Sequence, residues 1–433
     1  MSKEKYLKGD QRSKSALSGN PISWINDLSR HRQDGPAIKE KNWQKSSDST
    51  IAVHAGTMDD DATGAVGTPI YQTSTFSLGA DEYSAVEEGH ARDKFIYTRY
   101  GNPSQWAVQN KLAALEGAES ALVFSSGMAA ITASVMALMD KGAHVVASNE
   151  LYGGTYNLFN HEFPTFGMSV DFVDPTDYDS IEAAIQPNTQ ILYFEALTNP
   201  LLKLIDIERL ADIAKRHRLR LVVDATFVTP IGCKSLALGA DLVIHSCTKY
   251  LNGHSDLVAG CVMGSRKLVD MVWPRLLNYG GSIDPHAAFM LERGLKTLAI
   301  RMKAHQESAF QLAQFLESHP KTSAVRYPLL KSFPQYELGK KMLKNASGMI
   351  SFTVEGGDEA AIKVISKLKL SRQATSLGGV ESLVSLPFNT SHASSTVKQR
   401  ENMGIMPGCI RLSVGIEDGD DLIADFEQAL AQL

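Results

Sequence analysis

A lysine follows directly after a run of apolar residues that is typical of a buried strand. Lys249 lies in Ser246-Cys247-Thr248-Lys249-Tyr250, immediately after residues 241–245. Burial disfavours the charged form of an amine, and a neutral lysine amine condenses with aldehydes. The adjacent hydroxyls of Ser246 and Thr248 can bind a phosphate, so pyridoxal phosphate is the obvious partner. A lysine that only extends from a strand end into solvent fits this segment equally well.

Asp224 lies at the corresponding place on a neighbouring predicted strand. It closes the apolar run Leu221-Val222-Val223 and precedes Ala225-Thr226. A buried carboxylate keeps its charge only beside a cation or hydrogen-bond donors, and a protonated pyridine nitrogen is such a cation. A helix cap or a structural ion pair explains Asp224 equally well when it is considered alone. With Lys249 on the next strand, it indicates one ring held between the two side chains.

A phosphate site is also expected in a turn between a predicted strand and a predicted helix. Ser125-Ser126-Gly127-Met128 follows the apolar residues 121–124. Free backbone N–H groups at a helix N-terminus bind anions, and a glycine allows close approach. An ordinary strand-to-helix turn is the competing interpretation. The segment has neither GxGxxG nor GxxxxGK[ST], which argues against a dinucleotide or ATP phosphate.

Two further residues follow predicted strands. Asn199 comes after residues 190–194, where its amide can bond a ring hydroxyl or a substrate carboxylate. Tyr152 lies in the loop Leu151-Tyr152-Gly153-Gly154-Thr155, where its aromatic face can stack on a flat cofactor. Each residue alone is more typical of a turn or a core. Their expected position at one end of one sheet favours a shared site.

Residues 121–264 alternate between apolar runs and helical patterns. Strands are expected at residues 121–124, 144–147, 169–173, 190–194, 219–223, 242–245 and 258–263, with helices at 128–139, 180–185 and 207–217. This alternation predicts βαβ crossovers and a mostly parallel, seven-stranded sheet covered on both faces. Ligands of such sheets lie outside the carboxyl ends of the strands.

The pattern changes after about residue 295. One long helix is expected over residues 285–319, followed by strands at 324–327, 349–354 and 409–414 and an amphipathic helix at 420–430. The sequence therefore predicts a polar N-terminal arm (1–50), an N-terminal segment with a large domain (51–295) and a smaller C-terminal α+β domain (296–433).

Composition argues against several classes of function. The 433-residue chain carries a net charge of −5, which gives no bulk attraction to nucleic acid or anionic membranes. No apolar stretch reaches the roughly 20 residues that span a bilayer. Residues 1–50 lack the apolar core of a secretory signal and contain acids that transit peptides avoid. The cysteines form no CxxC pair and are expected to be reduced thiols of a cytoplasmic protein: Cys233, Cys247, Cys261 and Cys409.

Seven motifs occur in an order that resembles one known family. They are Tyr97-Thr98-Arg99-Tyr100-Gly101-Asn102-Pro103, Ser125-Ser126-Gly127-Met128, Leu151-Tyr152-Gly153-Gly154-Thr155, Asp224-Ala225-Thr226, Ser246-Cys247-Thr248-Lys249-Tyr250-Leu251-Asn252-Gly253-His254, Ser376-Leu377-Gly378-Gly379-Val380-Glu381-Ser382 and Ile410-Arg411-Leu412-Ser413-Val414-Gly415-Ile416-Glu417-Asp418. The chain resembles the cystathionine γ-synthase/γ-lyase family, the pyridoxal-phosphate-dependent enzymes of cysteine and methionine metabolism. The resemblance extends from about residue 50 to the C-terminus.

The resemblance implies an aspartate-aminotransferase-type fold and pyridoxal 5'-phosphate as the cofactor. It implies a homotetramer, a dimer of dimers in which two subunits share each active site, and a small amino-acid substrate. Lys249 would hold the cofactor covalently and carry protons, Asp224 would pair with the ring nitrogen, and Tyr152 would stack on the ring and act as a base. The implied cofactor-binding set is Tyr97 and Arg99 from the adjacent subunit, with Gly127, Met128, Tyr152, Asn199, Asp224, Thr226, Ser246, Thr248 and Lys249.

The resemblance also implies the substrate side of the site. Arg411 would bind the substrate carboxylate, helped by Asn199 and Ser376. An arginine suits this role because its planar fork matches a carboxylate with two bonds.

The implied reaction is γ-elimination or γ-replacement on a sulfur amino acid or an activated homoserine, as in transsulfuration. Methionine γ-lyase and O-acylhomoserine sulfhydrylase activities are alternatives, and an aminotransferase or a non-catalytic scaffold would belong to different classes. Thr375 stands where many cystathionine γ-lyases and bacterial γ-synthases carry Glu, and Gly154 stands where methionine γ-lyases typically carry Cys. The chain departs from both specialised patterns.

Overall fold

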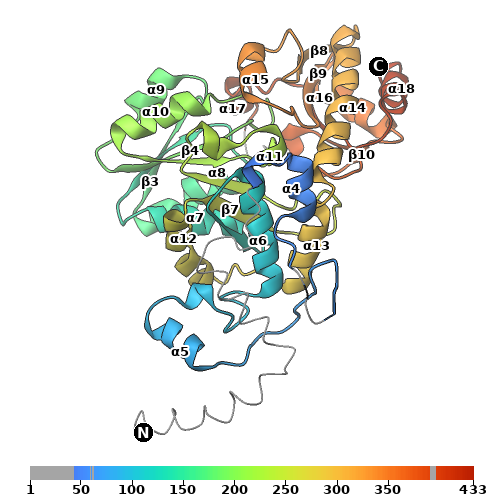
Figure 1. The fold of residues 1–433 in the computed structure, drawn as a ribbon. Coiled ribbons are helices and arrows are strands. Elements are labelled where there is room, and N and C mark those ends of the chain that lie inside the picture. Colours follow the sequence, from blue (N-terminus) through green and yellow to red (C-terminus); the bar gives the residue numbers. More distant parts are fainter. Residues whose placement is uncertain (1–42, 59, 61–62, 391–395) are drawn as a thin grey trace.

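The computed structural model describes residues 43–58, 60, 63–390 and 396–433. Within these residues the chain forms two β-sheets with helices packed around them (Figure 1). Most of the predicted N-terminal arm, residues 1–42, lies outside the described part.

The larger sheet has the strand order β1-β7-β6-β5-β4-β2-β3. Its strands are β1 (Ser120–Phe124), β2 (His144–Ser148), β3 (Ser169–Val173), β4 (Thr189–Glu195), β5 (Arg220–Asp224), β6 (Leu242–Ser246) and β7 (Gly260–Gly264). Neighbours run parallel except that β7 is antiparallel to both β6 and β1. The predicted seven-stranded, mostly parallel sheet is confirmed.

Helices pack on both faces of this sheet. The helices in this part of the chain are α4 (Asp48–His54), α5 (Ala80–Glu87), α6 (Pro103–Glu116), α7 (Gly127–Leu138), α8 (Gly153–Asn157), α9 (Tyr178–Ala183), α10 (Ile207–His217), α11 (Thr229–Gly232), α12 (Arg266–Tyr279) and α13 (Pro285–Leu295). Of these, α6, α7, α10 and α12 contact the strands directly. Successive strand residues alternate between two apolar clusters, as Val222 and Val223 do. One cluster joins the sheet to α7 and α12, and the other joins it to α6 and α10.

Local signals explain where the site-bearing helices begin. Asn102 precedes α6 and accepts a hydrogen bond from the Ser104 N–H, and Pro103 occupies the first helical position, where no N–H is needed. Ser126 precedes α7 and accepts one from the Ala129 N–H at 3.0 Å. The N-terminus of α7 is thereby fixed next to the end of β1.

The smaller sheet has the order β10-β11-β12-β9-β8. Its strands are β8 (Thr322–Arg326), β9 (Met349–Val354), β10 (Arg372–Gln373), β11 (Leu383–Ser385) and β12 (Cys409–Ser413), and its helices are α14 (Leu298–Ser318), α15 (Tyr336–Met342), α16 (Gly357–Lys367), α17 (Val397–Asn402) and α18 (Gly419–Leu430). Helix α14 contacts α18 and β8 as well as α4, so it joins the smaller sheet to the rest of the chain.

The single helix predicted over residues 285–319 is wrong. Two helices, α13 and α14, occupy this stretch and are separated at Lys296 and Thr297. The Gly294 carbonyl accepts hydrogen bonds from the Thr297 hydroxyl at 3.1 Å and from the Arg301 guanidinium at 2.8 Å. These side-chain donors satisfy the carbonyl at the break.

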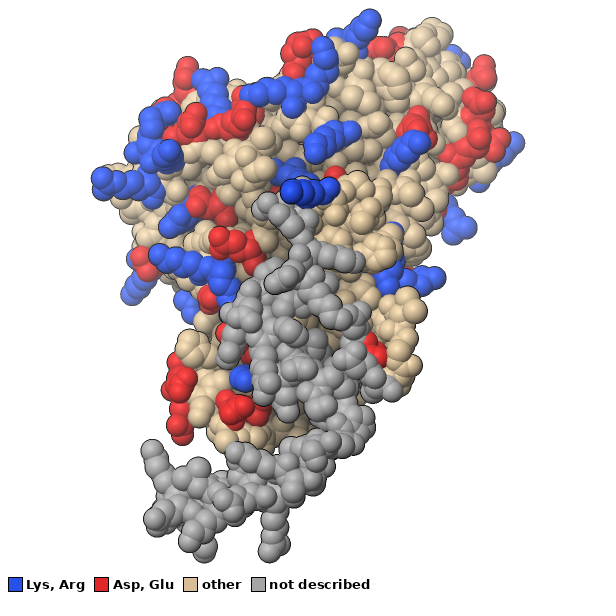
Figure 2. Space-filling view, in the orientation of Figure 1, with Lys and Arg blue, Asp and Glu red and all other residues tan. Residues whose placement is uncertain are grey.

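The described residues contain no helix long and apolar enough to cross a membrane. On the face shown in Figure 2, lysine and arginine side chains are interspersed with aspartate and glutamate over the upper part of the molecule. Helix α5 projects below the large sheet (Figure 1).

Candidate active site

A cavity of about 570 Å³ lies at the carboxyl ends of β4, β5 and β6, and we call it the strand-end cavity. It is lined by Ser126, Gly127, Met128, Ile131, Tyr152, Glu195, Leu197, Asn199, Asp224, Thr226, Phe227, Ser246, Thr248, Lys249, Val258, Thr375, Ser376, Leu377, Asn389, Thr390 and Arg411. Both sheets contribute, because Thr375 and Ser376 follow β10 and Arg411 lies on β12.

Two buried carboxyl groups form one wall of the strand-end cavity. Glu195 and Asp224 end adjacent strands and are paired in register, so both side chains leave the same face of the sheet. Asp224 accepts a hydrogen bond from the Thr226 N–H at 2.9 Å. Burial raises the pKa of Asp224, and burial followed by the charge of Asp224 raises the pKa of Glu195 well above its usual value. No lysine or arginine within the described chain forms an ion pair with either group. A protonated ring nitrogen would supply the missing cation.

A lysine lines the same cavity as these acids. Lys249 Nζ donates a hydrogen bond to Ser376 Oγ at 2.7 Å. Burial, and then the positive charge of Arg411, lowers the pKa of Lys249 to about 8. A substantial neutral fraction of this amine is therefore present near neutral pH. A neutral amine can attack a carbonyl carbon or accept a proton.

Arg411 lies at the end of the cavity next to Ser376. Its guanidinium donates to Asn199 Oδ1 at 3.2 Å and to the Ser376 carbonyl at 3.0 Å. Burial lowers the pKa of Arg411 to about 10, and neither partner carries a negative charge. A buried guanidinium bonded only to neutral oxygens is well suited to bind a substrate carboxylate.

The segment of Ser376 connects the lysine to the arginine. Ser376 has a φ of 78°, an unusual value for a residue with a side chain. In this conformation its hydroxyl faces Lys249 while its carbonyl faces Arg411. Ser376 therefore bonds the Lys249 amine and the Arg411 guanidinium at the same time.

The N-terminus of α7 and the end of β6 form the expected phosphate region. Gly127 and Met128 lie in the first turn of α7, where backbone N–H groups lack helical acceptors. A Cβ on Gly127 would lie 3.0 Å from Ser246 Cβ, so a side chain would fill the space between turn and strand. Ser246 donates its N–H to Thr226 Oγ1 at 2.9 Å, and Thr248 bonds the backbone of Ala259. These bonds fix the three hydroxyl residues Thr226, Ser246 and Thr248, all of which line the strand-end cavity.

Tyr152 is held by its backbone. Its side chain is 51% exposed, while its N–H donates to Glu195 Oε1 at 2.6 Å. A Cβ on Gly154 would lie 2.6 Å from the Tyr152 ring and 2.9 Å from Met128 Sδ. The ring occupies the space that a larger residue at position 154 would need.

Eleven of the thirteen predicted site residues line the strand-end cavity, and Tyr97 and Arg99 do not. Arg99 donates to the Leu277 carbonyl at 2.9 Å, at the end of α12, and Tyr97 is 43% exposed. Sequence reasoning overlooked Glu195, although a carboxylate that ends an apolar strand is the signal that identified Asp224. It also did not identify the loop and helix residues Ile131, Leu197, Phe227, Val258, Leu377, Asn389 and Thr390 as part of the site.

The residues present fit pyridoxal phosphate. The cavity combines a partly buried amine, two buried carboxyl groups that have no ion-pair partner in the described chain, a flat aromatic side chain and a helix N-terminus at which glycine leaves room. Lys249 would hold the cofactor, Asp224 would face its ring nitrogen, Tyr152 its ring, and Gly127 with Met128 its phosphate. When bound, this cofactor withdraws electrons from the Cα of an amino acid.

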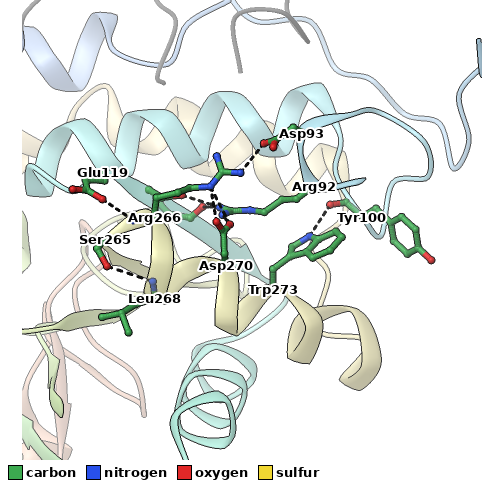
Figure 3. Close-up of polar contacts among 11 residues, drawn as sticks. Arg92, Asp93, Tyr100, Glu119, Ser265, Arg266, Leu268, Asp270 and Trp273 are labelled. Carbon is green, nitrogen blue, oxygen red and sulfur yellow. Dashed lines mark hydrogen bonds and ion pairs between the residues drawn. The ribbon is translucent and has the colours of Figure 1, made fainter. Parts of the chain in front are cut away.

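A larger cavity of about 990 Å³, which we call the side cavity, lies between α5, α6 and α12. Both of its arginines are paired with carboxylates, as Figure 3 shows: Asp270 contacts both Arg92 and Arg266, and Arg266 also bonds Asp93 at 2.7 Å. Trp273 donates to the Tyr100 carbonyl at 3.1 Å. These interactions join the segment around residues 91–100 to α12.

Comparison with known proteins agrees with this geometry. The family model described as Cys/Met metabolism PLP-dependent enzyme matches residues 49–431. The chain is 41% identical to L-methionine gamma-lyase of Treponema denticola, covering 92% of this chain and 100% of the relative. It is 42% identical to cystathionine gamma-lyase of Bacillus subtilis (89% and 99%) and 44% identical to cystathionine beta-lyase of Coxiella burnetii (90% and 99%). The crystal structure of metB from Corynebacterium glutamicum superposes with a TM-score of 0.85 at 40% identity, covering 90% of this chain and 99% of that one.

Proposed function

The chain belongs to the family of Cys/Met metabolism PLP-dependent enzymes, and from this premise we propose that it is a carbon–sulfur lyase acting at Cγ of sulfur amino acids. The observation that carries the proposal is the link from Lys249 through Ser376 to Arg411. It brings the Cα of an Arg411-bound amino acid to an amine whose pKa is about 8. The curated relatives named for lyase activity on methionine and cystathionine support the same reaction class.

Each of these residues has a separate role in the proposed reaction. Arg411 binds and orients the α-carboxylate, and Lys249 accepts the Cα proton once its nitrogen is free. Cβ is bonded to Cα, so the Lys249 amine that accepted the Cα proton is also close to Cβ. The same amine can therefore move a proton between the two carbons. Tyr152 confines the substrate from the exposed side of the cavity. The sulfur substituent leaves from the end lined by Thr375 and Val258.

The carboxyl groups that line the cavity within the described chain are Glu195 and Asp224, and both end strands of the large sheet. Thr375 contributes a neutral hydroxyl instead. A second ammonium group on the leaving substituent, as in cystathionine, therefore finds no partner at Thr375. This favours substrates whose sulfur substituent is small and uncharged.

Product analysis tests this function directly. Purified protein should be incubated separately with methionine, homocysteine, cystathionine and an O-acylhomoserine, with and without cysteine. We expect 2-oxobutyrate and ammonia, with methionine or homocysteine preferred over cystathionine. Pyruvate as the main product would indicate cleavage at Cβ, and a thioether without 2-oxo acid would indicate replacement.

Two alternatives from other classes give distinct results in the same assay. An aminotransferase would convert the bound cofactor stoichiometrically to its amine form without releasing a thiol or ammonia. A non-catalytic scaffold would lack the visible absorbance of the lysine-bound cofactor. Either outcome would contradict the proposed lyase.

We also propose that the protein is a homotetramer in which adjacent subunits complete each site. Support comes from Tyr97 and Arg99, which belong to the implied phosphate-binding set but lie away from the cavity of their own chain. Mixing Lys249→Ala subunits with Arg99→Ala subunits should restore activity that neither parent has. A mixture as inactive as its parents would place Arg99 outside the neighbouring site, and light scattering would report the subunit number.

A cytoplasmic location completes the proposal. The four cysteines are buried and free, as expected in a reducing compartment.

A further inference from the structure

The loops that carry Tyr152 and Asn199 are joined by a buried ion pair that lies outside the strand-end cavity. Glu150 is fully buried at the start of the Tyr152 loop. Lys203 Nζ lies 2.6 Å from Glu150 Oε1 and 2.9 Å from Asp174 Oδ2. The Thr198 hydroxyl donates to the other Glu150 oxygen, Oε2, at 2.8 Å. Both oxygens of the carboxylate are therefore engaged by the loop that follows β4.

Two hydrogen bonds between Thr198 and Lys203 close the loop that follows β4 and contains Asn199. The Thr198 N–H donates to the Lys203 carbonyl at 2.9 Å, and the Lys203 N–H donates to Thr198 Oγ1 at 2.9 Å. Asn199 lies directly after Thr198 and is 4% exposed, with Oδ1 accepting from Arg411. The position of the Asn199 amide thus depends on the two residues that bind Glu150.

The Tyr152 loop is fixed from the same direction. Ser148 Oγ accepts from the Glu150 N–H and donates to the Glu150 carbonyl, both at 3.0 Å, which forms a tight turn two residues before Tyr152. Glu195, the last residue of β4, accepts the Tyr152 N–H. Since the Tyr152 side chain is half exposed, these backbone anchors determine where its ring lies.

The contact between Glu150 and Lys203 depends on their opposite charges. Burial raises the pKa of Glu150, and the Lys203 charge opposes that shift. Loss of Lys203 would leave a carboxylate in the protein interior without its cation, a strongly destabilising arrangement. The carboxylate would then take up a proton or move toward water, and either change would release Thr198 or the Tyr152 loop.

We propose that Glu150 and Lys203 form a positioning clamp that sets the Tyr152 loop and the Asn199 loop at a fixed separation across the strand-end cavity. Neither residue lines the cavity, so both act through Tyr152 and Asn199. A displacement of about 1 Å in such groups can change catalytic efficiency by roughly 100-fold. The clamp therefore governs how cofactor and substrate are held without touching either one.

The test compares Lys203→Met with Lys203→Arg in the cofactor-loaded protein. The matched control is Lys341→Met, which removes an exposed lysine paired with Glu208. For each variant we would measure the pH titration of the cofactor's visible absorbance, its near-UV and visible circular dichroism, kcat and KM, and thermal unfolding. The kinetic part rests on the proposed function; the absorbance and dichroism parts rest on cofactor binding alone.

We expect Lys203→Met to shift the absorbance titration, to weaken the visible dichroism and to lower kcat/KM by about 10- to 100-fold. Lys203→Arg should restore the spectra and most of the activity, and Lys341→Met should match the parent protein. If Lys203→Met does not fold, Glu150→Gln keeps the side-chain shape and serves in the same measurements.

Unchanged spectra and unchanged kcat/KM in a variant that only unfolds at lower temperature would overturn the proposal, because the pair would then stabilise the fold alone. If no sulfur amino acid is a substrate of the parent protein, the lyase function fails but the spectra still decide the clamp.

Discussion

The strand-end cavity and the side cavity differ in the partners of their basic side chains. In the side cavity, Arg92 and Arg266 share Asp270, and Arg266 also binds Asp93 (Figure 3). In the strand-end cavity, Lys249 and Arg411 face neutral oxygens. The side cavity is the larger one, yet both of its arginines are paired with carboxylates. Volume therefore does not identify the functional site here, whereas uncompensated buried charge does.

The comparison predicts that the lysine of the strand-end cavity is indispensable. Lys249→Ala should lower turnover by roughly three orders of magnitude or more, because it removes the amine that holds the cofactor and transfers protons. Steady-state kinetics and the loss of lysine-bound cofactor absorbance would show this. Lys94→Ala in the side cavity is the control and should retain activity per folded molecule. If Lys94→Ala lost as much activity as Lys249→Ala, the two cavities would not differ in their importance for turnover.

An arginine-to-lysine change in each cavity keeps the positive charge but removes the planar fork of hydrogen-bond donors. Arg411→Lys should raise KM by roughly 10- to 100-fold, since losing one charge-assisted hydrogen bond costs about 1.5–3 kcal/mol. Arg266→Lys makes the same change in the side cavity and should leave KM unaltered. Substrate-saturation curves give the KM of each variant. If the KM of Arg411→Lys equals that of the parent protein, the substrate carboxylate does not bind at Arg411.

The lowered pKa of Lys249 predicts a pH dependence for capture of added cofactor by stripped protein. The neutral amine reacts, and the pKa is about 8, so the capture rate should rise about tenfold between pH 7 and pH 9. Stopped-flow absorbance follows the reaction. Arg411→Met should move the midpoint upward, because the Arg411 charge contributes to lowering this pKa. A midpoint near 10 in the parent protein would mean that the amine is solvated.

A smaller effect is expected at Gly154. Gly154→Ala places a Cβ 2.6 Å from the Tyr152 ring, and displacement of the ring should lower kcat/KM by about tenfold. Gly67→Ala is the control because a Cβ there meets no atom within 4 Å. Kinetics identical to the parent would show that the ring position is not critical.

The smallest effect concerns the side cavity itself. Asp270→Asn should reduce the free energy of unfolding by about 1 kcal/mol and leave kcat/KM unchanged, because its ion pairs are partly exposed. Chemical denaturation and kinetics on the same preparation test both statements. A selective loss of activity would give this cavity a role that its pairing does not indicate.

The sequence predicted those elements whose apolar period is distinct. Strands β3 and β9 and helix α10 begin and end at the predicted residues. Helix α6 was not predicted because it is buried on nearly every side and therefore lacks an amphipathic period. Helix α12 contains Pro274 in its interior, a residue that argues against a helix.

The site could be predicted where a polar residue follows an apolar strand, as at Asp224 and Lys249. No such signal marks Leu377, Asn389 or Thr390, which reach the cavity from loops of the smaller sheet. Their approach depends on how the two sheets pack, and a local pattern contains no information about that packing.

The two sheets contribute different properties to one cavity. Asp224 ends one strand of the large sheet and Lys249 follows another, and we propose that both contact the cofactor, whereas Thr375 lies in a loop after β10 of the smaller sheet. A substitution at Thr375 can therefore change which leaving group is accepted while the proton-transfer apparatus remains intact. Substrate preference in such a protein can therefore diverge through substitution of Thr375, an exposed loop residue that is not part of the hydrophobic core.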